Sequence, residues 1–237
     1  MNSSIPTVYE SLQAAYGPQG WWPISGKYFP GDYSRPRDDA EAFEVCVGAL
    51  LAQNTAWKNA EKAVASLASV NALNPQKITV LEQGVLAQLI RSSGYYNQKA
   101  LRLKLFSDFV VCEGGLEKLF ALPLPELRAK LLALNGVGEE TADSIILYAA
   151  KKPSFVVDAY TKRIAFRLGL LPEDASYAQT KELFEASLPS DYAAYNECHA
   201  LLVEHAKRHC TKKAPRCSDC PLQRNCNYTK TRLATKP

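Results

Sequence analysis

Four cysteines near the C-terminus follow the spacing C-x6-C-x2-C-x5-C: Cys210, Cys217, Cys220 and Cys226. Four thiolates this close together in a chain without an export signal indicate a metal centre rather than disulfides. A tetrahedron of sulfurs suits zinc and an iron–sulfur centre alike, so the spacing alone leaves both open. In either case the metal would hold the loop around these cysteines in shape.

Basic residues surround these cysteines, from Lys207 to Lys236, and are opposed by a single acid, Asp219. The net charge of +4 and the pI near 8.6 are modest and do not by themselves name a partner. The concentration of charge at this end predicts contact with a polyanion such as a DNA backbone, with Lys212 and Lys213 as candidate ligands. A merely solvated tail is the alternative.

A second candidate site is the turn Asn135-Gly136-Val137-Gly138, which joins two segments with helical periodicity, 125–134 and 139–150. The two glycines allow a tight turn and a close approach to another surface. Amides at the head of a new helix bind phosphate through hydrogen bonds and the helix dipole. The turn therefore predicts a helix-hairpin-helix that grips the DNA backbone, with an ordinary αα-turn as the alternative.

An aspartate follows a short apolar segment about twenty residues after this turn: Phe155-Val156-Val157-Asp158 leads into a helical segment at 161–170. Asp158 could be no more than a helix N-cap, or it could supply a carboxylate for catalysis. Three tryptophans also stand out by their placement, Trp21 and Trp22 before a proline-rich connector and Trp57 after an apolar helix.

These residues need a helical scaffold to position them. Apolar residues recur at helical spacing in the segments 40–53, 60–70, 85–94, 99–111 and 195–209. Only Phe155 to Val157 has an extended pattern, so we expect an all-α protein of about ten helices. Residues 23–38 form a connector, which predicts one helical domain over 40–150 and a second built from 1–39 and 151–237.

The bulk composition fits a soluble globular protein, since 47% of the 237 residues are hydrophobic. The N-terminal segment has no signal-peptide pattern, and no run approaches the roughly 18 apolar residues of a membrane span. We therefore expect a cytoplasmic protein with no membrane partner. Its remaining cysteines, Cys46, Cys112 and Cys198, should be core residues.

The chain resembles the endonuclease III superfamily of DNA glycosylases, named for a helix-hairpin-helix and a Gly/Pro-rich loop with a following aspartate. The matching segments, together with the cysteine run, are LLAQNT (50–55), GYYNQKA (94–100), LNGVGEETAD (134–143) and VVDAYTKR (156–163). The resemblance implies the helix-hairpin-helix glycosylase fold, with two helical domains and a [4Fe-4S] cluster on the four cysteines. It also implies that Asp158 is catalytic and that Gln53 and Tyr95 wedge into the duplex where a nucleotide is flipped out.

The sequence departs from part of this superfamily at Glu140. Members that also cut the DNA backbone carry a lysine here, whose amine forms a Schiff base with the sugar. A glutamate cannot do this, so the resemblance implies a glycosylase without AP lyase activity. Lyase action through Lys151 or Lys152 is the alternative.

A closer resemblance links the chain to the 3-methyladenine DNA glycosylases of the same superfamily, through Trp21-Trp22-Pro23 and Gln53-Asn54-Thr55-Ala56-Trp57. An N3- or N7-alkylated purine carries positive charge, and an indole face attracts a cationic ring more than a neutral one, by about 0.5 to 2 kcal/mol per contact. We expect Trp21 and Trp57 to sandwich the base and Trp22 to line the pocket wall. Not all of these relatives keep the four cysteines.

The sequence thus predicts a monomeric, nucleoid-associated glycosylase that hydrolytically excises alkylated bases from double-stranded DNA in base excision repair. A mismatch, uracil or adenine glycosylase of the same superfamily is one alternative. A non-catalytic DNA-binding or redox-sensing iron–sulfur protein is the other.

Overall fold

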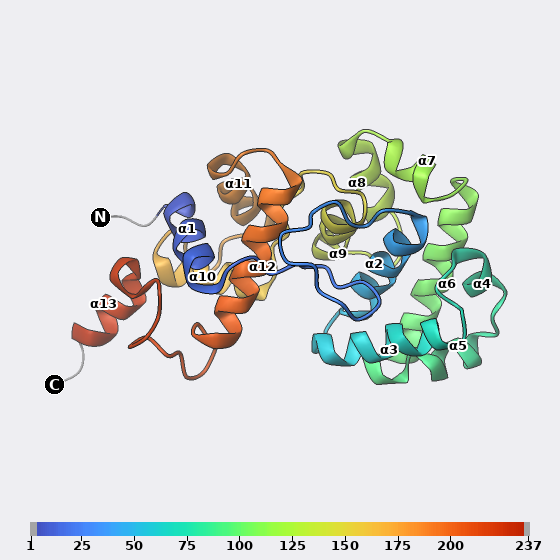
Figure 1. Cartoon of the computed structure of the whole chain (residues 1–237), viewed down its shortest axis with the longest axis horizontal. Coiled ribbons are helices and arrows are strands. Elements are labelled where there is room, and N and C mark those ends of the chain that lie inside the picture. The colour runs from blue at the N-terminus through green and yellow to red at the C-terminus, as the bar shows by residue number, and fades with distance from the viewer. Residues whose placement is uncertain (1–3, 235–237) are drawn as a thin grey trace. The chain divides into compact units, whose positions relative to one another are not determined.

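The computed structural model of the protein describes the backbone of residues 4–234 and the side chains of residues 4–230. Over these residues it is helical without a β-strand, apart from one isolated bridge between Ile24 and Lys27 (Figure 1). The predicted all-α fold class is confirmed. Within the described part, no helix combines the length and hydropathy needed to cross a membrane.

The chain divides into two compact units. The first is built from Met1–Trp21, Phe29–Gly31 and Pro153–Pro237. Its helices are α1 (Ile5–Tyr16), α10 (Ala159–Leu168), α11 (Tyr177–Ser187), α12 (Tyr192–Arg208), the 3-10 turn η3 (Gln223–Asn225) and α13 (Asn227–Ala234). Helix α12 is the centre of this unit and packs against α1 and α10.

The second unit is built from Trp22–Tyr28 and Asp32–Lys152. Its first helices are α2 (Asp39–Leu51), α3 (Trp57–Ser69), α4 (Pro75–Val80), α5 (Gln83–Leu89), the 3-10 turn η1 (Arg91–Ser93) and α6 (Tyr96–Cys112). It continues with α7 (Leu116–Ala121), α8 (Leu124–Leu132), α9 (Glu139–Ser144) and the π-helical turn η2 (Ile145–Ala149).

Helix α2 is the core of the second unit because it is buried on all sides over most of its length. Every residue from Ala42 to Leu51 is buried, and α3, α6 and η2 pack around it. Asp38 begins the helix, since its carboxylate accepts a hydrogen bond from the amide of Glu41. Gln53 follows the end of this buried helix by two residues.

The connector is shared between the units, whereas the sequence analysis assigned all of residues 1–39 to the domain that holds the C-terminus. Residues 22–28 and 32–39 pack with the second unit. Two long-range contacts account for this: Trp22 lies against Tyr148, with ring centroids 5.3 Å apart, and the amide of Ser25 donates to Glu44. Neither contact has a local signature in the sequence.

Candidate functional site

Asp158 is the N-cap of α10 and keeps one carboxylate oxygen outside the cap. Its Oδ1 accepts hydrogen bonds from the amide of Thr161 at 2.7 Å and from the hydroxyl of Thr161 at 2.9 Å. The extended segment Phe155–Val157 is buried and brings Asp158 to the surface, where 14% of its side chain is exposed. Asp158 therefore does cap the helix, through Oδ1, and Thr161 makes no hydrogen bond to Oδ2.

His199 of α12 faces this free oxygen, with Nε2 3.7 Å from Oδ2 of Asp158. Burial acts to raise the pKa of Asp158, but the hydrogen bonds and charge of His199 and the hydrogen bonds from Thr161 outweigh it. The net result is a pKa below the usual range of an aspartate. Asp158 is consequently an anion at neutral pH, as an electrostatic stabiliser of a developing cation must be.

The predicted hairpin joins α8 and α9 through residues 133–138. Gly136 has a φ of +86°, in the left-handed region that favours glycine, and Val137 is buried beneath the turn. Asp143, which is fully buried, receives two hydrogen bonds from the guanidinium of Arg128 and so ties α9 to α8. At Gly138 the backbone is open, because an added Cβ would meet nothing within 4 Å.

Gln53 is bonded to this hairpin instead of projecting freely. Its Nε2 donates to the carbonyl of Gly136 at 2.8 Å and to the hydroxyl of Thr141 at 2.9 Å. Its Oε1 accepts from Arg102 at 2.7 Å. The amide therefore links α2, α6 and the hairpin, and insertion of Gln53 into a duplex would require these bonds to break.

Tyr95, unlike Gln53, projects from the surface of its unit. It precedes α6 in a left-handed conformation with a φ of +46°, and 69% of the residue is exposed. A large aromatic ring held outward by a strained backbone is free to contact a second molecule.

The structure brings two of the three predicted pocket tryptophans together. The rings of Trp22 and Trp57 meet edge to face in the second unit, with centroids 5.0 Å apart and an interplanar angle of 86°. Trp21 belongs to the first unit, where the ammonium of Lys207 lies 5.6 Å from its ring centroid. Trp22 and Trp57 thus line a shared pocket.

Glu140 lies exposed in the first turn of α9, where an acid is favourable next to the helix N-terminus. The ammonium of Lys151 donates to the carbonyls of Ser34 and Pro36, both at 3.0 Å. This lysine holds the connector of its own unit in place. The hydrogen bonds leave it poorly suited to act as a nucleophile.

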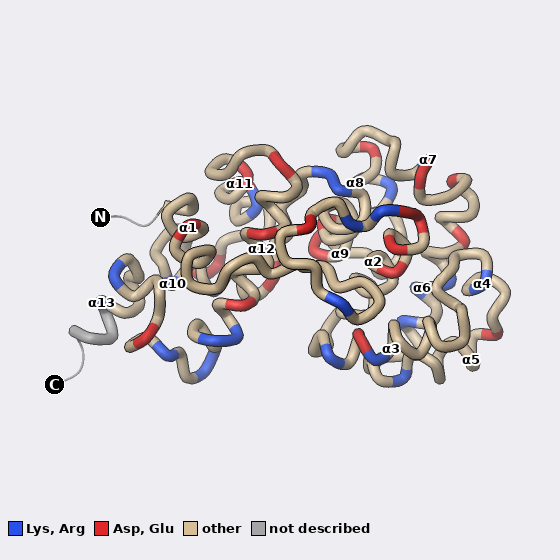
Figure 2. The backbone as a smooth tube through the Cα atoms, in the orientation of Figure 1, with Lys and Arg blue, Asp and Glu red and all other residues tan. Residues whose placement is uncertain are grey.

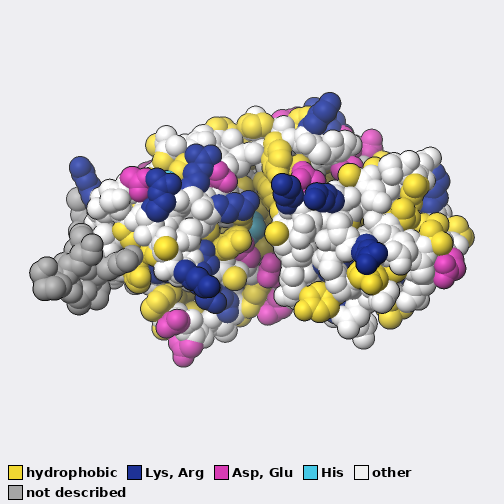
Figure 3. Space-filling model, turned by 90° about the horizontal axis from the view of Figure 1, so that it is seen from below, with side chains coloured by type: hydrophobic (Ala, Val, Ile, Leu, Met, Phe, Trp, Pro, Cys, Tyr) yellow, Lys and Arg dark blue, Asp and Glu magenta, His cyan; other side chains and the backbone are white. Residues whose placement is uncertain are grey.

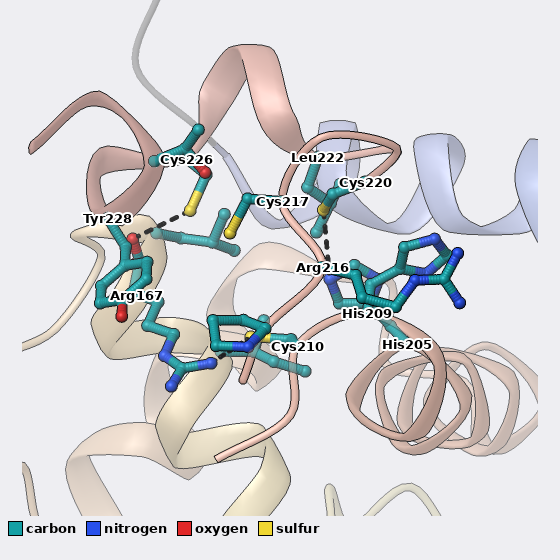
Figure 4. A pocket seen from close by; sticks show the side chains of 14 residues that line it. Arg167, His205, His209, Cys210, Arg216, Cys217, Cys220, Leu222, Cys226 and Tyr228 are labelled. Atoms are coloured by element: carbon teal, nitrogen blue, oxygen red, sulfur yellow. Dashed lines mark hydrogen bonds between the residues drawn. The ribbon is translucent and has the colours of Figure 1, made fainter. Parts of the chain in front are cut away.

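The four cysteines of the C-terminal loop line one pocket of the first unit (Figure 4). Its walls are apolar at Ile164, Leu168 and Leu222. Arg167 of α10 fixes the loop: its guanidinium donates to Sγ of Cys210 at 3.2 Å and to the carbonyls of Thr211 and Lys212. Burial first, and then the neighbouring cysteines, raise the pKa of Cys220 to about 11.

Within the described residues, no three side chains of His, Cys, Asp or Glu gather closely enough to hold one metal ion. The four thiols nevertheless line one pocket together, and four cysteine sulfurs are a donor set of the kind that binds zinc or an iron–sulfur cluster.

The loop between α12 and α13 carries much of the positive charge of its unit (Figure 2). Lys212, Lys213 and Arg224 are exposed, and Arg216 is ion-paired with Asp219. Figure 3 shows Lys and Arg side chains at several further places on the surface, interspersed with acids. The side chain of Arg232 and the whole of Lys236, also counted in the basic run, lie outside the described residues.

Sequence reasoning missed His199, Arg102 and Glu44. His199 is one of only three histidines in the chain and lies on the buried side of α12. Glu44 is an acid within the otherwise apolar face of α2. A charged or titratable residue at a position that helical periodicity assigns to the core was the signal available for both.

Comparison with known proteins gives concordant matches. A model of the HhH-GPD superfamily of base excision DNA repair proteins matches residues 47–190. MJ1434 of Methanocaldococcus jannaschii, which is named as a DNA repair glycosylase, is 46% identical over 94% of this chain and 95% of its own length. Endonuclease III of Thermotoga maritima is 30% identical over 84% of this chain and 89% of its own.

Two solved structures resemble the fold. The H. pylori 3-methyladenine DNA glycosylase MagIII, bound to 1,N6-ethenoadenine, superposes with a TM-score of 0.71 at 26% identity, covering 87% of this chain and 98% of that one. A non-covalent complex of endonuclease III with DNA superposes with a TM-score of 0.78 at 20% identity, covering 98% of this chain and 97% of that one.

Proposed function

This chain belongs to the HhH-GPD superfamily of base excision DNA repair proteins and is a DNA glycosylase of that superfamily, and we propose that it excises alkylated, 3-methyladenine-type bases from duplex DNA. The observation that carries the proposal is the pairing of Trp22 with Trp57 in one pocket, together with Asp158 kept as an anion. Aromatic faces attract a cationic base, and a carboxylate stabilises the cationic sugar left behind.

An alkylated purine is already positively charged, so its glycosidic bond breaks without protonation of the leaving base. Asp158 acts on the sugar side, where its free Oδ2 faces developing positive charge or orients the attacking water. Trp22 and Trp57 hold the base. The sequence analysis instead paired Trp21 with Trp57 and gave Trp22 the pocket wall, and contact of Trp21 with the base stays a prediction. Tyr95, which is exposed, wedges into the duplex. Gln53 holds the hairpin through its hydrogen bond to Gly136, and it enters the duplex only when that bond breaks.

The reaction ends at base release, without AP lyase action. Glu140 stands where a Schiff-base lysine is expected, and Lys151 is bonded to two carbonyls. A glutamate has no amine with which to attack the sugar. The product is therefore an intact abasic strand.

The duplex is held by its backbone. Asn135, Gly136 and Gly138 offer amides at the head of α9, and Lys212 and Lys213 offer exposed ammonium groups. Val137, which the sequence analysis also expected to contact the backbone, instead shapes the turn, because it is buried and its amide donates to the carbonyl of Leu134 at 3.1 Å. We propose a monomer, which is sufficient because one chain supplies all of these groups. Chromosomal DNA as substrate would place the protein on the nucleoid.

We propose a [4Fe-4S] cluster on the four cysteines, as the resemblance to the endonuclease III superfamily implies. The four sulfurs line one pocket with apolar walls, and Arg167 donates to Sγ of Cys210. A cluster, in which each thiolate binds a different iron, would hold the loop that carries Lys212 and Lys213 in shape.

The deciding experiment incubates the protein with duplex DNA treated with a methylating agent and identifies the released bases by mass. Release of methylated adenine or guanine supports the proposal. Release of uracil from uracil-containing DNA, or of adenine from mismatched duplexes, with none from methylated DNA, would replace it with a mismatch-type glycosylase. Binding to damaged DNA without any release would indicate a non-catalytic protein.

A further inference from the structure

A pocket of about 430 Å³ opens within the second unit, between the connector, α2 and α3. Its lining includes Trp22, Ser25, Glu44, Trp57 and Glu61. Its volume lies in the range of small-molecule sites in proteins, about 300 to 1,000 Å³. All of its lining residues belong to one unit, so the pocket is complete within that unit.

The carboxylate of Glu44 is the unusual group in this pocket. Only 9% of the residue is exposed, and burial raises its pKa despite hydrogen bonds from Ser25. The amide of Ser25 donates to Oε1 at 2.6 Å, and the Ser25 hydroxyl lies 3.5 Å from Oε2. These bonds orient the carboxylate without neutralising its charge.

No basic side chain compensates Glu44. In residues 4–230 it forms no ion pair, and the pocket lining contains a second acid, Glu61, but no lysine, arginine or histidine. A buried carboxylate normally has a charged partner, because removal of an ion from water is costly. A ligand can therefore supply the positive charge that Glu44 lacks as a partner.

The aromatic residues define the shape of that ligand. The indoles of Trp22 and Trp57 meet at 86°, so a flat ring that lies on one indole presents its edge to the other. The negative faces of both rings favour a cation over a neutral ring of the same size. The pocket thus combines flat walls with negative potential.

We propose that Glu44 is the specificity-determining residue of this enzyme, whose carboxylate selects a positively charged N-alkylated purine in the Trp22–Trp57 pocket over a neutral purine. This inference rests on the proposed function, since it assigns the base to this pocket. The tryptophans accept purines in general, and Glu44 supplies the preference for charge.

The test compares Glu44→Gln with wild type on two kinds of duplex, one containing cationic 7-methylguanine and one containing neutral 1,N6-ethenoadenine. Glutamine keeps the size of the side chain and an acceptor for the amide of Ser25. We expect kcat/KM for 7-methylguanine to fall by about tenfold or more, with release of the neutral base changed less than about twofold. Equal losses on both substrates, or no loss, would overturn the proposal.

Two further variants separate charge from folding. Glu44→Asp keeps the charge and should retain the preference for the cationic base. Glu182→Gln removes an equal charge from an exposed position of α11 and should leave both rates unchanged. If Glu44→Gln unfolds, as judged by circular dichroism, Glu44→Asp decides: a preference lost with the charge retained counts against the proposal.

A binding assay keeps this inference distinct from the proposed function. Quenching of tryptophan fluorescence is measured with 7-methylguanosine, at a pH where it is cationic, and with guanosine. Preferential binding of 7-methylguanosine that Glu44→Gln abolishes supports the assignment of Glu44, even if wild type releases no alkylated base and the proposed function fails. Equal binding of the two nucleosides by wild type refutes it.

Discussion

Nε2 of His199 lies 3.7 Å from Oδ2 of Asp158, on the side of the carboxylate that Thr161 leaves free. One oxygen of Asp158 thus begins a helix, and the other faces a titratable ring from α12. A single carboxylate can in this way be both held in place and kept chemically available. Oδ1 fixes the position of the carboxylate, and Oδ2 remains for the reaction.

Asp158→Asn should abolish base release while leaving the fold intact. Asparagine is also a good N-cap and keeps an oxygen for the amide of Thr161, but it lacks the negative charge that stabilises the sugar cation. We expect the single-turnover rate to fall by about a hundredfold to ten-thousandfold. Mass analysis of released bases checks the rate and a thermal melt checks the fold. A variant with full activity would remove Asp158 from the mechanism.

The lowered pKa of Asp158 predicts a dependence of stability on pH. Because the folded-state pKa lies below the unfolded value of about 3.9, the ionised carboxylate contributes stability that is fully present above that value. The contribution is lost as the pH falls through the folded-state pKa. Urea unfolding of wild type and Asp158→Asn should therefore give a difference in unfolding free energy that is constant near neutral pH and shrinks in acid. A difference that grows in acid contradicts the assignment.

Gln53 and Tyr95 should respond differently to truncation. Gln53→Ala removes hydrogen bonds to Gly136, Thr141 and Arg102 and should lower the unfolding free energy by about 1 to 3 kcal/mol. Tyr95→Ala alters an exposed ring and should leave stability within about 0.5 kcal/mol while slowing base release. Denaturant unfolding measures both, with exposed Gln98→Ala as the control for Gln53. Equal stability of Gln53→Ala and wild type would mean that its amide is not a structural link.

Iron analysis of the purified protein should give four iron atoms per chain, with a broad visible absorption that disappears in Cys217→Ser. Loss of one thiolate ligand removes the group that holds the loop, so affinity for undamaged duplex should also fall. Cys112→Ser is the matched control, since Cys112, which the sequence analysis expected in the core, is exposed and is remote in sequence from the four ligands. One zinc atom per chain, with no iron, would refute the assignment of a [4Fe-4S] cluster.

Borohydride should not trap wild type on DNA that contains an abasic site, because Glu140 has no amine. Glu140→Lys introduces an amine at an exposed position of α9 and should produce a covalent complex that denaturing gel electrophoresis detects. Lys151→Gln in the wild-type background should change nothing. A wild-type complex that Lys151→Gln eliminates would establish lyase action through that residue.

Local patterns in the sequence were sufficient for the all-α fold class and for several caps and turns, although the described residues form thirteen α-helices where about ten were expected. Asp38 and Asp158 each cap a helix through residues three positions further on, so their roles depend on neighbours along the chain. The turn at Gly136 and the spacing of the four cysteines are likewise local, and the structure has the predicted turn and groups the cysteines around one pocket. Short-range geometry follows from the residue types because few backbone conformations satisfy it.

The partners of the functional side chains were decided by tertiary structure. The amide of Gln53 meets Gly136 at a separation of 83 residues, so the residue predicted as a wedge also links helices. His199 reaches Asp158 only because α12 packs against α10. Glu44 belongs by periodicity to the core, and only the packing of the connector beside α2 turns it into the wall of a pocket. Contacts between distant segments depend on how whole helices pack, so residue types and spacing along the chain determine the chemistry available but not which groups meet.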